Sequence, residues 1–274
     1  MAENTKIQWT DHTWNPWTGC KKVSSGCKFC YMYRDKERYG LDPTTVIRSK
    51  PPTFNKPLNW KEPAKVFTCS WSDFFIEEAD LCRDDAWQII KDTPHLTYQI
   101  LTKRPERIIK NLPYQIIKTH ISEPNTKLPY IPSNVWLGVS AGNQEDYEKM
   151  WLTLKTVKLT LGGVFFLSLE PLTDPIDLSR AITTIDETEG IQPNWVIVGG
   201  ESGNEKGKYR YRKCELDWIT SIVDQCLMRK IPVCVKQLGT HLSKELGLKD
   251  RHGGDWNEWP GEIQIRQFPK TIYQ

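Results

Sequence analysis

Residues 135–169 read VWLGVSAGNQEDYEKMWLTLKTVKLTLGGVFFLSL, and this stretch decides the fold. Two short apolar runs, Val135–Ser140 and Val164–Leu169, have the composition of strands that are buried on both faces. The segment 144–158 between them has a helical pattern. A strand, a helix and a strand in this order predict two parallel strands joined by a crossover helix.

The same alternation continues on both sides of this unit. Further strands are predicted, with a strand-like stretch near the N-terminus, at 7–10, 66–70, 97–102, 195–200 and Val233–Gln237. Further helices are predicted at 31–39, 80–91, 105–111 and 215–229. The class is therefore α/β, with about six to seven parallel strands in a partial or nearly closed (β/α) barrel. An open doubly wound sheet fits the same pattern. We favour the barrel because most polar signatures come just after the strands, at the edge where barrel enzymes place their sites.

A chain of 274 residues suits one large α/β domain or two small ones. We expect a single barrel domain over residues 1–240, followed by a mostly irregular C-terminal tail, residues 241–274, that packs on the barrel. The five prolines within 41–64 predict an irregular connection.

Composition and charge narrow the class of protein. The net charge of +3 is too small to imply nucleic-acid binding by itself. The sequence has no run of 18 apolar residues, and its first residues lack the apolar stretch of a signal peptide. We therefore expect a cytoplasmic protein without a membrane partner. In a reducing compartment, closely spaced cysteines indicate metal or redox chemistry more than disulfides.

Three of the eight cysteines, Cys20, Cys27 and Cys30, are clustered with the spacing C-x6-C-x2-C. They lie in residues 19–31, which we call the cysteine loop. Iron–sulfur clusters are held by cysteine thiolates. Three thiolates on one loop can cap three irons of a [4Fe–4S] cubane and leave the fourth iron open. A zinc site completed by His12 or another cysteine is the alternative, although no second C-x2-C pair follows.

The other five cysteines are scattered along the chain. They are Cys69, Cys82, Cys214, Cys226 and Cys234. Three of them, Cys69, Cys226 and Cys234, fall in apolar runs or on helix faces, and we expect these to be core residues.

The cysteine loop with Phe29 just before its last cysteine resembles that of the radical S-adenosylmethionine (radical SAM) superfamily. The common spacing there is C-x3-C-x2-C, so the first gap of six residues is a departure. The chain is most similar to a phage- and bacteria-associated radical-SAM-like family of unassigned substrate. The ordered motifs that carry this resemblance are TWNPWTGC (13–20), SGCKFCY (25–31), SDFF (72–75), LTKRPER (101–107), NVWLGVS (134–140), SLEPL (168–172), VGGESG (198–203) and VKQLG (235–239).

The resemblance implies an enzyme with two cofactors, a [4Fe–4S] cluster and S-adenosylmethionine. The open iron would bind the amino and carboxylate groups of S-adenosylmethionine. One electron from an external reductant would then break a sulfonium C–S bond, giving methionine and a 5′-deoxyadenosyl radical that abstracts hydrogen from a substrate. The basic loop described below and the phage association both favour a nucleic-acid base, in DNA-lesion repair or base modification. A peptide or small metabolite stays open.

The candidate site residues follow the predicted strands or belong to the cysteine loop. The metal ligands are Cys20, Cys27 and Cys30. The candidate cofactor-binding residues are Phe29, Ser70, Ser72, Asp73, Thr102, Ser140, Asn143 and Ser168, and the candidate catalytic residues are Lys103, Glu170, Glu201 and Lys236. Radical SAM proteins often carry Gly-Gly-Glu after the second strand, and this chain does not. Each strand-end residue has a structural alternative as a turn or capping residue.

Lys236 closes an apolar strand, so it needs a partner, and Glu170 or Glu201 is expected to supply it. Residues 206–213, which we call the basic loop, carry five cations and two tyrosines. Such a segment either contacts nucleic acid or is solvated. Two other classes of function remain open: a zinc- or cluster-stabilised module that binds nucleic acid or protein, and a redox sensor that does not use S-adenosylmethionine.

Overall fold

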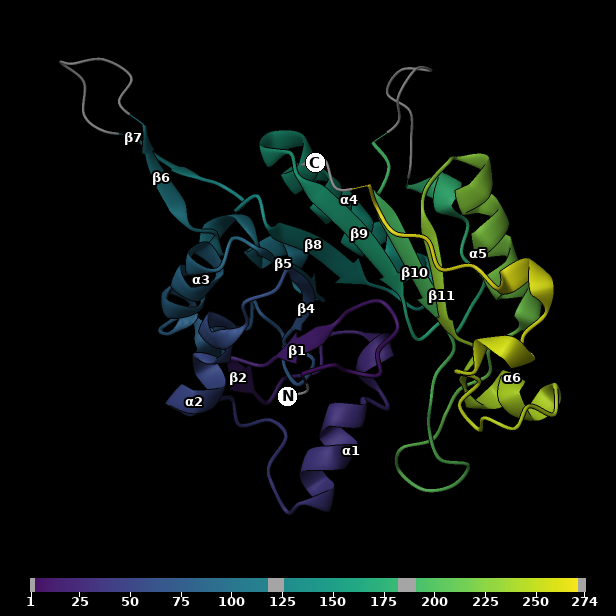
Figure 1. The fold of residues 1–274 in the computed structure, drawn as a ribbon. Coiled ribbons are helices and arrows are strands. Elements are labelled where there is room, and N and C mark those ends of the chain that lie inside the picture. Colours follow the sequence, from purple (N-terminus) through teal and green to yellow (C-terminus); the bar gives the residue numbers. More distant parts are fainter. Residues whose placement is uncertain (1–2, 118–125, 182–190, 271–274) are drawn as a thin grey trace.

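A computed structural model describes residues 3–117, 126–181 and 191–270 of the chain. Its centre is a curved sheet of parallel strands that forms a half-barrel (Figure 1). In spatial order the strands are β1 (His12–Trp14), β4 (Ala64–Thr68), β5 (Leu96–Thr102), β8 (Val135–Ser140), β9 (Val164–Leu169), β10 (Trp195–Gly199) and β11 (Val233–Gln237). The α/β class and the partial barrel are therefore confirmed.

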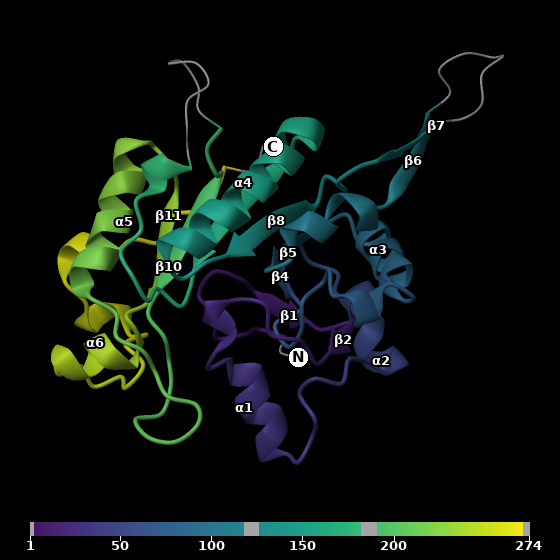
Figure 2. The ribbon, with the colours of Figure 1, turned by 180° about the vertical axis from the view of Figure 1, so that it is seen from behind.

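The helices are α1 (Tyr31–Arg38), α2 (Pro51–Phe54), α3 (Arg83–Asp92), α4 (Gln144–Leu161), α5 (Leu216–Met228) and α6 (Gly239–Glu245). Of these, α3, α4 and α5 cover the outer face of the sheet, whereas α1 projects beyond its end (Figure 2). α4 packs on β8 and β9, and α5 packs on β10 and β11. Two small antiparallel pairs join β2 (Trp17–Thr18) to β3 (Ile47–Arg48) and β6 (Tyr114–Ile117) to β7 (Thr126–Pro129). Within the described ranges, no helix combines the length and the apolar composition that crossing a bilayer requires.

The strands have two different faces, because successive side chains point to opposite sides. On β9, Phe165 and Leu167 belong to the large outer core, which also contains the buried residues of α3, α4 and α5. Phe166, between them, belongs to a separate cluster with Trp136 of β8 and Trp195 of β10. This second cluster contains no helix residue and fills the concave side of the half-barrel. Gly138 is required there, because a Cβ would lie 2.4 Å from the Phe166 ring.

The N-terminal strand is one place where the sequence prediction was wrong. Residues 7–10 form a turn, and the first strand is β1. Trp9 turns into the concave side, where its ring lies 4.6 Å from that of Phe67. The apolar side chains of this stretch therefore fill the interior and do not extend the sheet. Residues 105–111, predicted as one helix, form two short 3-10 helices, Pro105–Arg107 and Ile109–Asn111.

The C-terminal segment covers the free edge of β11. The amide of Val235 donates to the carbonyl of Ile265 at 2.9 Å, and that of Gln267 donates to Val233 at 2.8 Å. The indole of Trp195 also donates to the Gln267 carbonyl at 2.8 Å. The segment thus packs on the barrel and supplies hydrogen bonds that an edge strand lacks. The sequence prediction missed α6 within it.

Candidate functional site

The cysteine loop lies at the carboxyl end of the sheet and is attached to the loop that follows β4. Ser72 Oγ donates to the Gly19 carbonyl at 2.6 Å. The amide of Gly19 donates to the Trp71 carbonyl at 2.9 Å. Gly19 has a φ of +100°, and a Cβ there would lie 2.1 Å from the carbonyl oxygen of Thr45. Only glycine fits this backbone without strain, so the residue before Cys20 sets where the loop begins.

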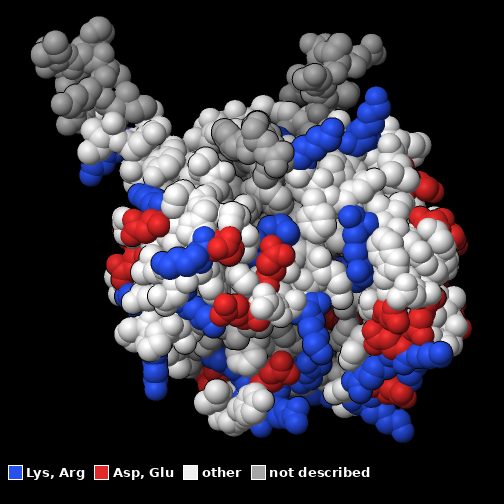
Figure 3. Space-filling model, viewed as in Figure 1, with Lys and Arg blue, Asp and Glu red and all other residues white. Residues whose placement is uncertain are grey.

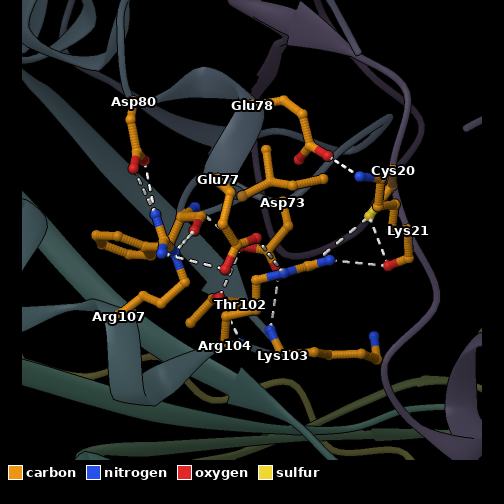
Figure 4. A network of polar contacts seen from close by, with 12 residues as sticks. Cys20, Lys21, Asp73, Glu77, Glu78, Asp80, Thr102, Lys103, Arg104 and Arg107 are labelled. Atoms are coloured by element: carbon orange, nitrogen blue, oxygen red, sulfur yellow. Dashed lines mark hydrogen bonds and ion pairs between the residues drawn. The ribbon is translucent and has the colours of Figure 1, made fainter. Parts of the chain in front are cut away.

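A buried polar network joins this loop to the end of β5 (Figure 4). Asp73 Oδ1 accepts a hydrogen bond of 2.7 Å from Thr102 Oγ1, and Oδ2 accepts one of 2.9 Å from the Lys103 amide. Arg104 then spans the gap to the cysteine loop. Its Nη1 lies 3.9 Å from Cys20 Sγ, and its Nη2 donates to the Lys21 carbonyl at 2.9 Å. A cation thus lies beside the first of the three cysteines.

The electrostatics differ between the thiols. Burial and the nearby Asp73 carboxylate raise the pKa of Cys20 to about 12, although Arg104 opposes this. Burial also raises the pKa of Cys27, but the Lys103 ammonium and hydrogen bonds from the Val23 and Ser24 backbone outweigh it, so the net pKa is lowered. Lys103 and Arg104 both extend from the end of β5 toward the cysteine loop (Figure 4). These cations favour thiolates, the form in which cysteines bind metals.

Tyr33 of α1 lies near all three cysteines of the loop. Burial and then the charges of Cys20, Cys30 and Cys27 raise its pKa to about 12. Its hydroxyl donates to the Cys20 carbonyl at 2.5 Å. All eight cysteines are free thiols, and the three on the loop are half-buried. Cys69, Cys226 and Cys234 are buried, which confirms their prediction as core residues.

The donor set agrees in kind with an iron–sulfur cluster: three free thiols on one loop, with two cations beside them. In the described part of the chain, no three His, Cys, Asp or Glu side chains form a group that could hold a metal ion. A cubane places its three cysteines on three different irons, so it requires thiols around a shared space and not three donors at one point. His12, the expected fourth zinc ligand, instead lies 4.5 Å from the Trp60 ring and accepts from the Asn4 amide.

The other side of the cysteine loop is attached to β8 and β10. Asn143 caps α4 by accepting from the Asp146 amide at 2.8 Å, and its Nδ2 donates to Ser25 Oγ at 2.9 Å. Glu201 binds Arg212 in a bidentate pair of 2.8 and 2.7 Å. The Nη1 of Arg212 donates to the Ser25 carbonyl at 3.0 Å. Asn143 and Glu201 therefore both act on one residue of the loop, the second of them through Arg212.

Phe29 lies beside the same arginine. The Arg212 guanidinium is 5.6 Å from the centroid of the Phe29 ring. This separation is within the range of a cation–π interaction. Phe29 therefore packs on the ion pair that links the basic loop to the cysteine loop.

A polar rim borders the concave face at the carboxyl end of the strands, and we call it the mouth. It consists of Lys103, Ser140, Ser168, Glu170 and Lys236. These residues continue the alternation of the concave cluster, since Leu101, Trp136, Phe166 and Cys234 precede them on the same strands. The sequence analysis therefore named five side chains that share one face.

Glu170 and Lys236 form the central contact of the mouth. Lys236 Nζ lies 2.5 Å from Glu170 Oε2, so one of the two expected partners of Lys236 is confirmed. Ser140 Oγ donates to the Glu170 carbonyl at 2.9 Å. The second carboxylate oxygen, Glu170 Oε1, is buried and has no hydrogen-bond partner among the described residues. A buried acceptor without a partner is costly, and a bound donor would relieve that cost.

Ser70 connects the loop after β4 to α1 and to Asn15. The hydroxyl of Tyr31, the first residue of α1, donates to the Ser70 carbonyl at 2.5 Å. Ser70 Oγ accepts from Asn15 Nδ2 at 3.0 Å. Burial raises the pKa of the Tyr31 hydroxyl, and the charges of Cys30 and Glu170 raise it further. The Tyr31 hydroxyl therefore lies between the cysteine loop and the mouth.

The predicted residues thus separate into two groups. Ser72, Asp73 and Thr102 hold loops together through protein hydrogen bonds on the outer side of the sheet, and their cofactor-binding role stays a prediction. The mouth residues face the concave side. The sequence analysis assigned no site role to Asn15, Tyr31 and Tyr33. Tyr31 and Asn15 stand inside the quoted motifs, and that position was the available signal.

The basic loop is partly engaged in ion pairs. Lys208 binds Glu37 of α1 at 2.7 Å, Arg212 binds Glu201, and Lys213 binds Glu215. Lys206 and Arg210 have no ion pair within the described residues. The loop is therefore attached to α1, to Glu201 after β10 and, through Arg212, to Ser25 of the cysteine loop.

Comparison with known proteins places the chain without naming an activity. No curated protein and no solved structure matches it. Residues 4–267 match the family described as "protein of unknown function (DUF5131)". This match covers nearly the whole chain, and the protein therefore belongs to the DUF5131 family of unknown function.

Proposed function

We propose that this protein is a radical SAM enzyme in which Cys20, Cys27 and Cys30 hold a [4Fe–4S] cluster. The observation that supports this most is the position of the cysteine loop. Its three free thiols all lie close enough to Tyr33 for their charges to raise its pKa, and Lys103 and Arg104 lie beside two of them. Sites of (β/α) barrels lie at the carboxyl end of the strands, where this loop lies. The sequence resemblance to the radical SAM superfamily points to the same chemistry.

When bound, a cluster with an open iron supplies one-electron cleavage of S-adenosylmethionine to methionine and a 5′-deoxyadenosyl radical. The chain's own residues would bind and orient the cluster, the cosubstrate and the substrate. Lys103 and Arg104 offset the negative charge of the thiolates. Glu170 Oε1 is a free acceptor for an amine or a hydroxyl of the cosubstrate or substrate.

The concave floor beneath the mouth keeps water away from the reaction. Trp9, Trp136, Phe166 and Trp195 fill it and are almost fully buried. A reactive radical requires exclusion of solvent and of competing hydrogen donors. Ser140, Ser168 and Lys236 border this floor and are proposed to position the substrate.

An external reductant must supply the electron, and we propose that the protein works in the reducing cytoplasm. Its eight free cysteines are consistent with that compartment. The substrate class that we favour is a nucleic-acid base, because the basic loop contacts the cysteine loop through Arg212 and carries two cations, Lys206 and Arg210, without an ion pair in the described residues.

The test uses protein purified without oxygen and reconstituted with iron and sulfide. Dithionite and S-adenosylmethionine are added, and 5′-deoxyadenosine is measured by mass spectrometry. We expect product from the parent and none from Cys27→Ala. Cys82→Ala is the matched control, since Cys82 is a half-buried thiol outside the loop, and it should keep the activity.

Two outcomes would contradict the proposal. Zinc at one ion per chain in place of iron would identify a structural binding module. Cluster absorption without 5′-deoxyadenosine, even with single-stranded DNA present, would identify a redox sensor.

A further inference from the structure

We propose that a pocket beside α1 binds a backbone phosphate of single-stranded nucleic acid. The pocket has a volume of about 340 Å³ and is lined by Arg34, Asp35, Arg38, Asn204, Arg251 and His252; we call it the arginine pocket. The inference deepens the proposed function, on which it rests only for the claim that a base of the strand reaches the mouth.

The charge of the arginine pocket favours an anion. Three arginines face one carboxylate, Asp35, which Arg34 binds through Nε at 2.9 Å. Arg38 and Arg251 have no ion pair in the described part of the chain. Guanidinium groups are always charged and match the fork geometry of phosphate oxygens. The three guanidinium groups repel one another, Asp35 and Asp250 offset part of that repulsion, and a bound anion would reduce it further.

The pocket walls are held in place by the backbone. Asp250 accepts from the amides of His252 at 3.0 Å and Gly254 at 2.9 Å, which fixes the turn that carries Arg251. The Gly239 amide donates to the His252 carbonyl at 3.1 Å. Burial and then the charges of Arg251 and Arg34 lower the pKa of His252, although the Asp250 carboxylate opposes this. The cations of α1 and of the tail therefore act on one shared space.

The direction of α1 links this pocket to the mouth. Residues three, four and seven positions apart lie on one helix face, so Tyr31 shares a face with Arg34, Asp35 and Arg38. Tyr31 stands at the mouth end of that face, and the residue is 43% exposed although its hydroxyl is buried. Arg34 follows Cys30 by four residues, about 6 Å along the helix axis. A stacking surface and a phosphate site thus lie in line.

The adjoining basic loop favours a strand over a single nucleotide. Its free cations Lys206 and Arg210 follow Asn204, which lines the pocket. Figure 3 shows Lys and Arg side chains, with Asp and Glu side chains among them, along the lower part of this face, where Figure 1 places α1, the basic loop and α6. A row of cations with an exposed aromatic ring is the usual surface for single strands. A base must also leave a duplex before an enzyme can act on it in a pocket.

The test measures binding of a fluorescently labelled 12-nucleotide single-stranded DNA by anisotropy. It uses the full chain as isolated, without reductant or S-adenosylmethionine. The pocket variant replaces three arginines, Arg34→Gln, Arg38→Gln and Arg251→Gln. The charge-matched control replaces three exposed cations elsewhere, Lys61→Gln, Lys110→Gln and Arg180→Gln. Circular dichroism checks that both variants are folded.

We expect the pocket variant to bind about tenfold or more weakly at 0.1 M salt, because it cannot form the charged hydrogen bonds to phosphate. The slope of log affinity against log salt should fall by about 0.7 for each phosphate that the variant no longer neutralises. The control should stay within about twofold of the parent. A pocket variant that binds as tightly as the control would overturn the proposal.

Two further variants and a competitor test its parts. Tyr31→Ala should weaken binding about tenfold because the stacking ring is removed, whereas Tyr31→Phe, which keeps the ring, should not. Full displacement of the DNA by micromolar adenosine monophosphate would contradict the proposal that the pocket binds a strand, and it would identify a mononucleotide site. Because no step uses the cluster, a failure here is independent of a failure to form 5′-deoxyadenosine.

Discussion

The Nη1 of Arg104 lies 3.3 Å from the Oδ2 of Asp73, and the two side chains are only 5% and 6% exposed. This pair joins the loop after β4 to the end of β5, and the same guanidinium reaches Cys20. The buried pair of Arg104 and Asp73 therefore contributes both to the position of Cys20 and to the stability of the half-barrel. Removing one partner of such a pair leaves the other charge uncompensated in a low-dielectric site.

We accordingly expect Arg104→Ala to lower the free energy of unfolding by about 3 kcal/mol. Urea denaturation followed by tryptophan fluorescence measures it. Arg48→Ala is the matched control, since Arg48 binds Asp85 in an exposed pair and should cost less than about 1 kcal/mol. Equal losses of unfolding free energy in the two variants would show that the buried pair with Asp73 stabilises the fold no more than an exposed pair does.

The reactivity of Cys27 tests the role of Lys103. The Lys103 ammonium helps to lower the pKa of this thiol below its ordinary value of 9.0, so more thiolate exists at pH 8 than for a free cysteine. In a Cys20→Ser, Cys30→Ser background, Lys103→Met should slow alkylation of Cys27 by up to about tenfold. Peptide mass spectrometry after timed iodoacetamide treatment gives the rate.

Lys21→Met is the control for that experiment, because the Lys21 ammonium is bound to Glu78 (Figure 4). It should leave the Cys27 rate within about twofold of the background protein. A rate that is unaffected by Lys103→Met would contradict the assignment of this cation to Cys27.

Gly19 is the next test, because its backbone sets the start of the cysteine loop. Gly19→Ala should displace the loop, since its Cβ would overlap the Thr45 carbonyl. We expect a stability loss of about 2–3 kcal/mol and weak iron incorporation on reconstitution. Gly40→Ala also has a positive φ but has no atom within 4 Å of the new Cβ, so it should cost only about 1 kcal/mol. Similar iron content in both variants would contradict the steric argument.

Much of the sheet could be predicted from sequence because buried parallel strands are short apolar runs. The bounds of β8, β9 and β11 match the prediction at both ends. Residues 7–10 could not be predicted correctly from composition, because an apolar side chain fits a strand or a plug equally well. The contact of Trp9 with Phe67 decides between them, and it joins residues far apart in the chain.

In the candidate site too, local sequence patterns predict which residues share a strand face but not which distant residues pair. Alternation along strands places Ser168 and Glu170 on one face, and that could be read from the sequence. The pairing of Arg212 with Glu201 depends on the path of the basic loop after β10, which no local pattern encodes. The choice of Glu170 over Glu201 as partner of Lys236 follows from this pairing, since Glu201 is already bound.

The contact between Glu170 and Lys236 predicts coupling between the two side chains. Both are mostly buried, so Lys236→Met leaves the Glu170 carboxylate without its ion-pair partner and should cost about 2 kcal/mol of stability. Glu170→Gln alone should cost a similar amount. The double variant should cost less than the sum, by about 1 kcal/mol or more. Additive losses in this double-mutant cycle would show that the contact has no net energy.

Lys158 predicts how stability changes with pH. Burial lowers its pKa to about 8 from the ordinary 10.5, while its Nζ donates to the Gln192 carbonyl at 2.7 Å. Between pH 8 and 10.5 the unfolded chain holds this proton and the folded chain does not, so stability rises with pH across that window. Below pH 8 the charged amine is buried and its cost is fully present.

Solvent still reaches this half-buried side chain, so we expect the rise from Lys158 to be about 2 kcal/mol and not the full value of the shift. Urea denaturation at intervals from pH 7.5 to 10.5 measures it. The parent curve should exceed that of Lys158→Met in slope, while Lys110→Met, an exposed control, should follow the parent. Parallel curves for the parent and Lys158→Met would mean that Lys158 keeps its ordinary pKa. The slope, and not the stability at one pH, is the deciding quantity, because removing Lys158 also leaves the Gln192 carbonyl without its donor.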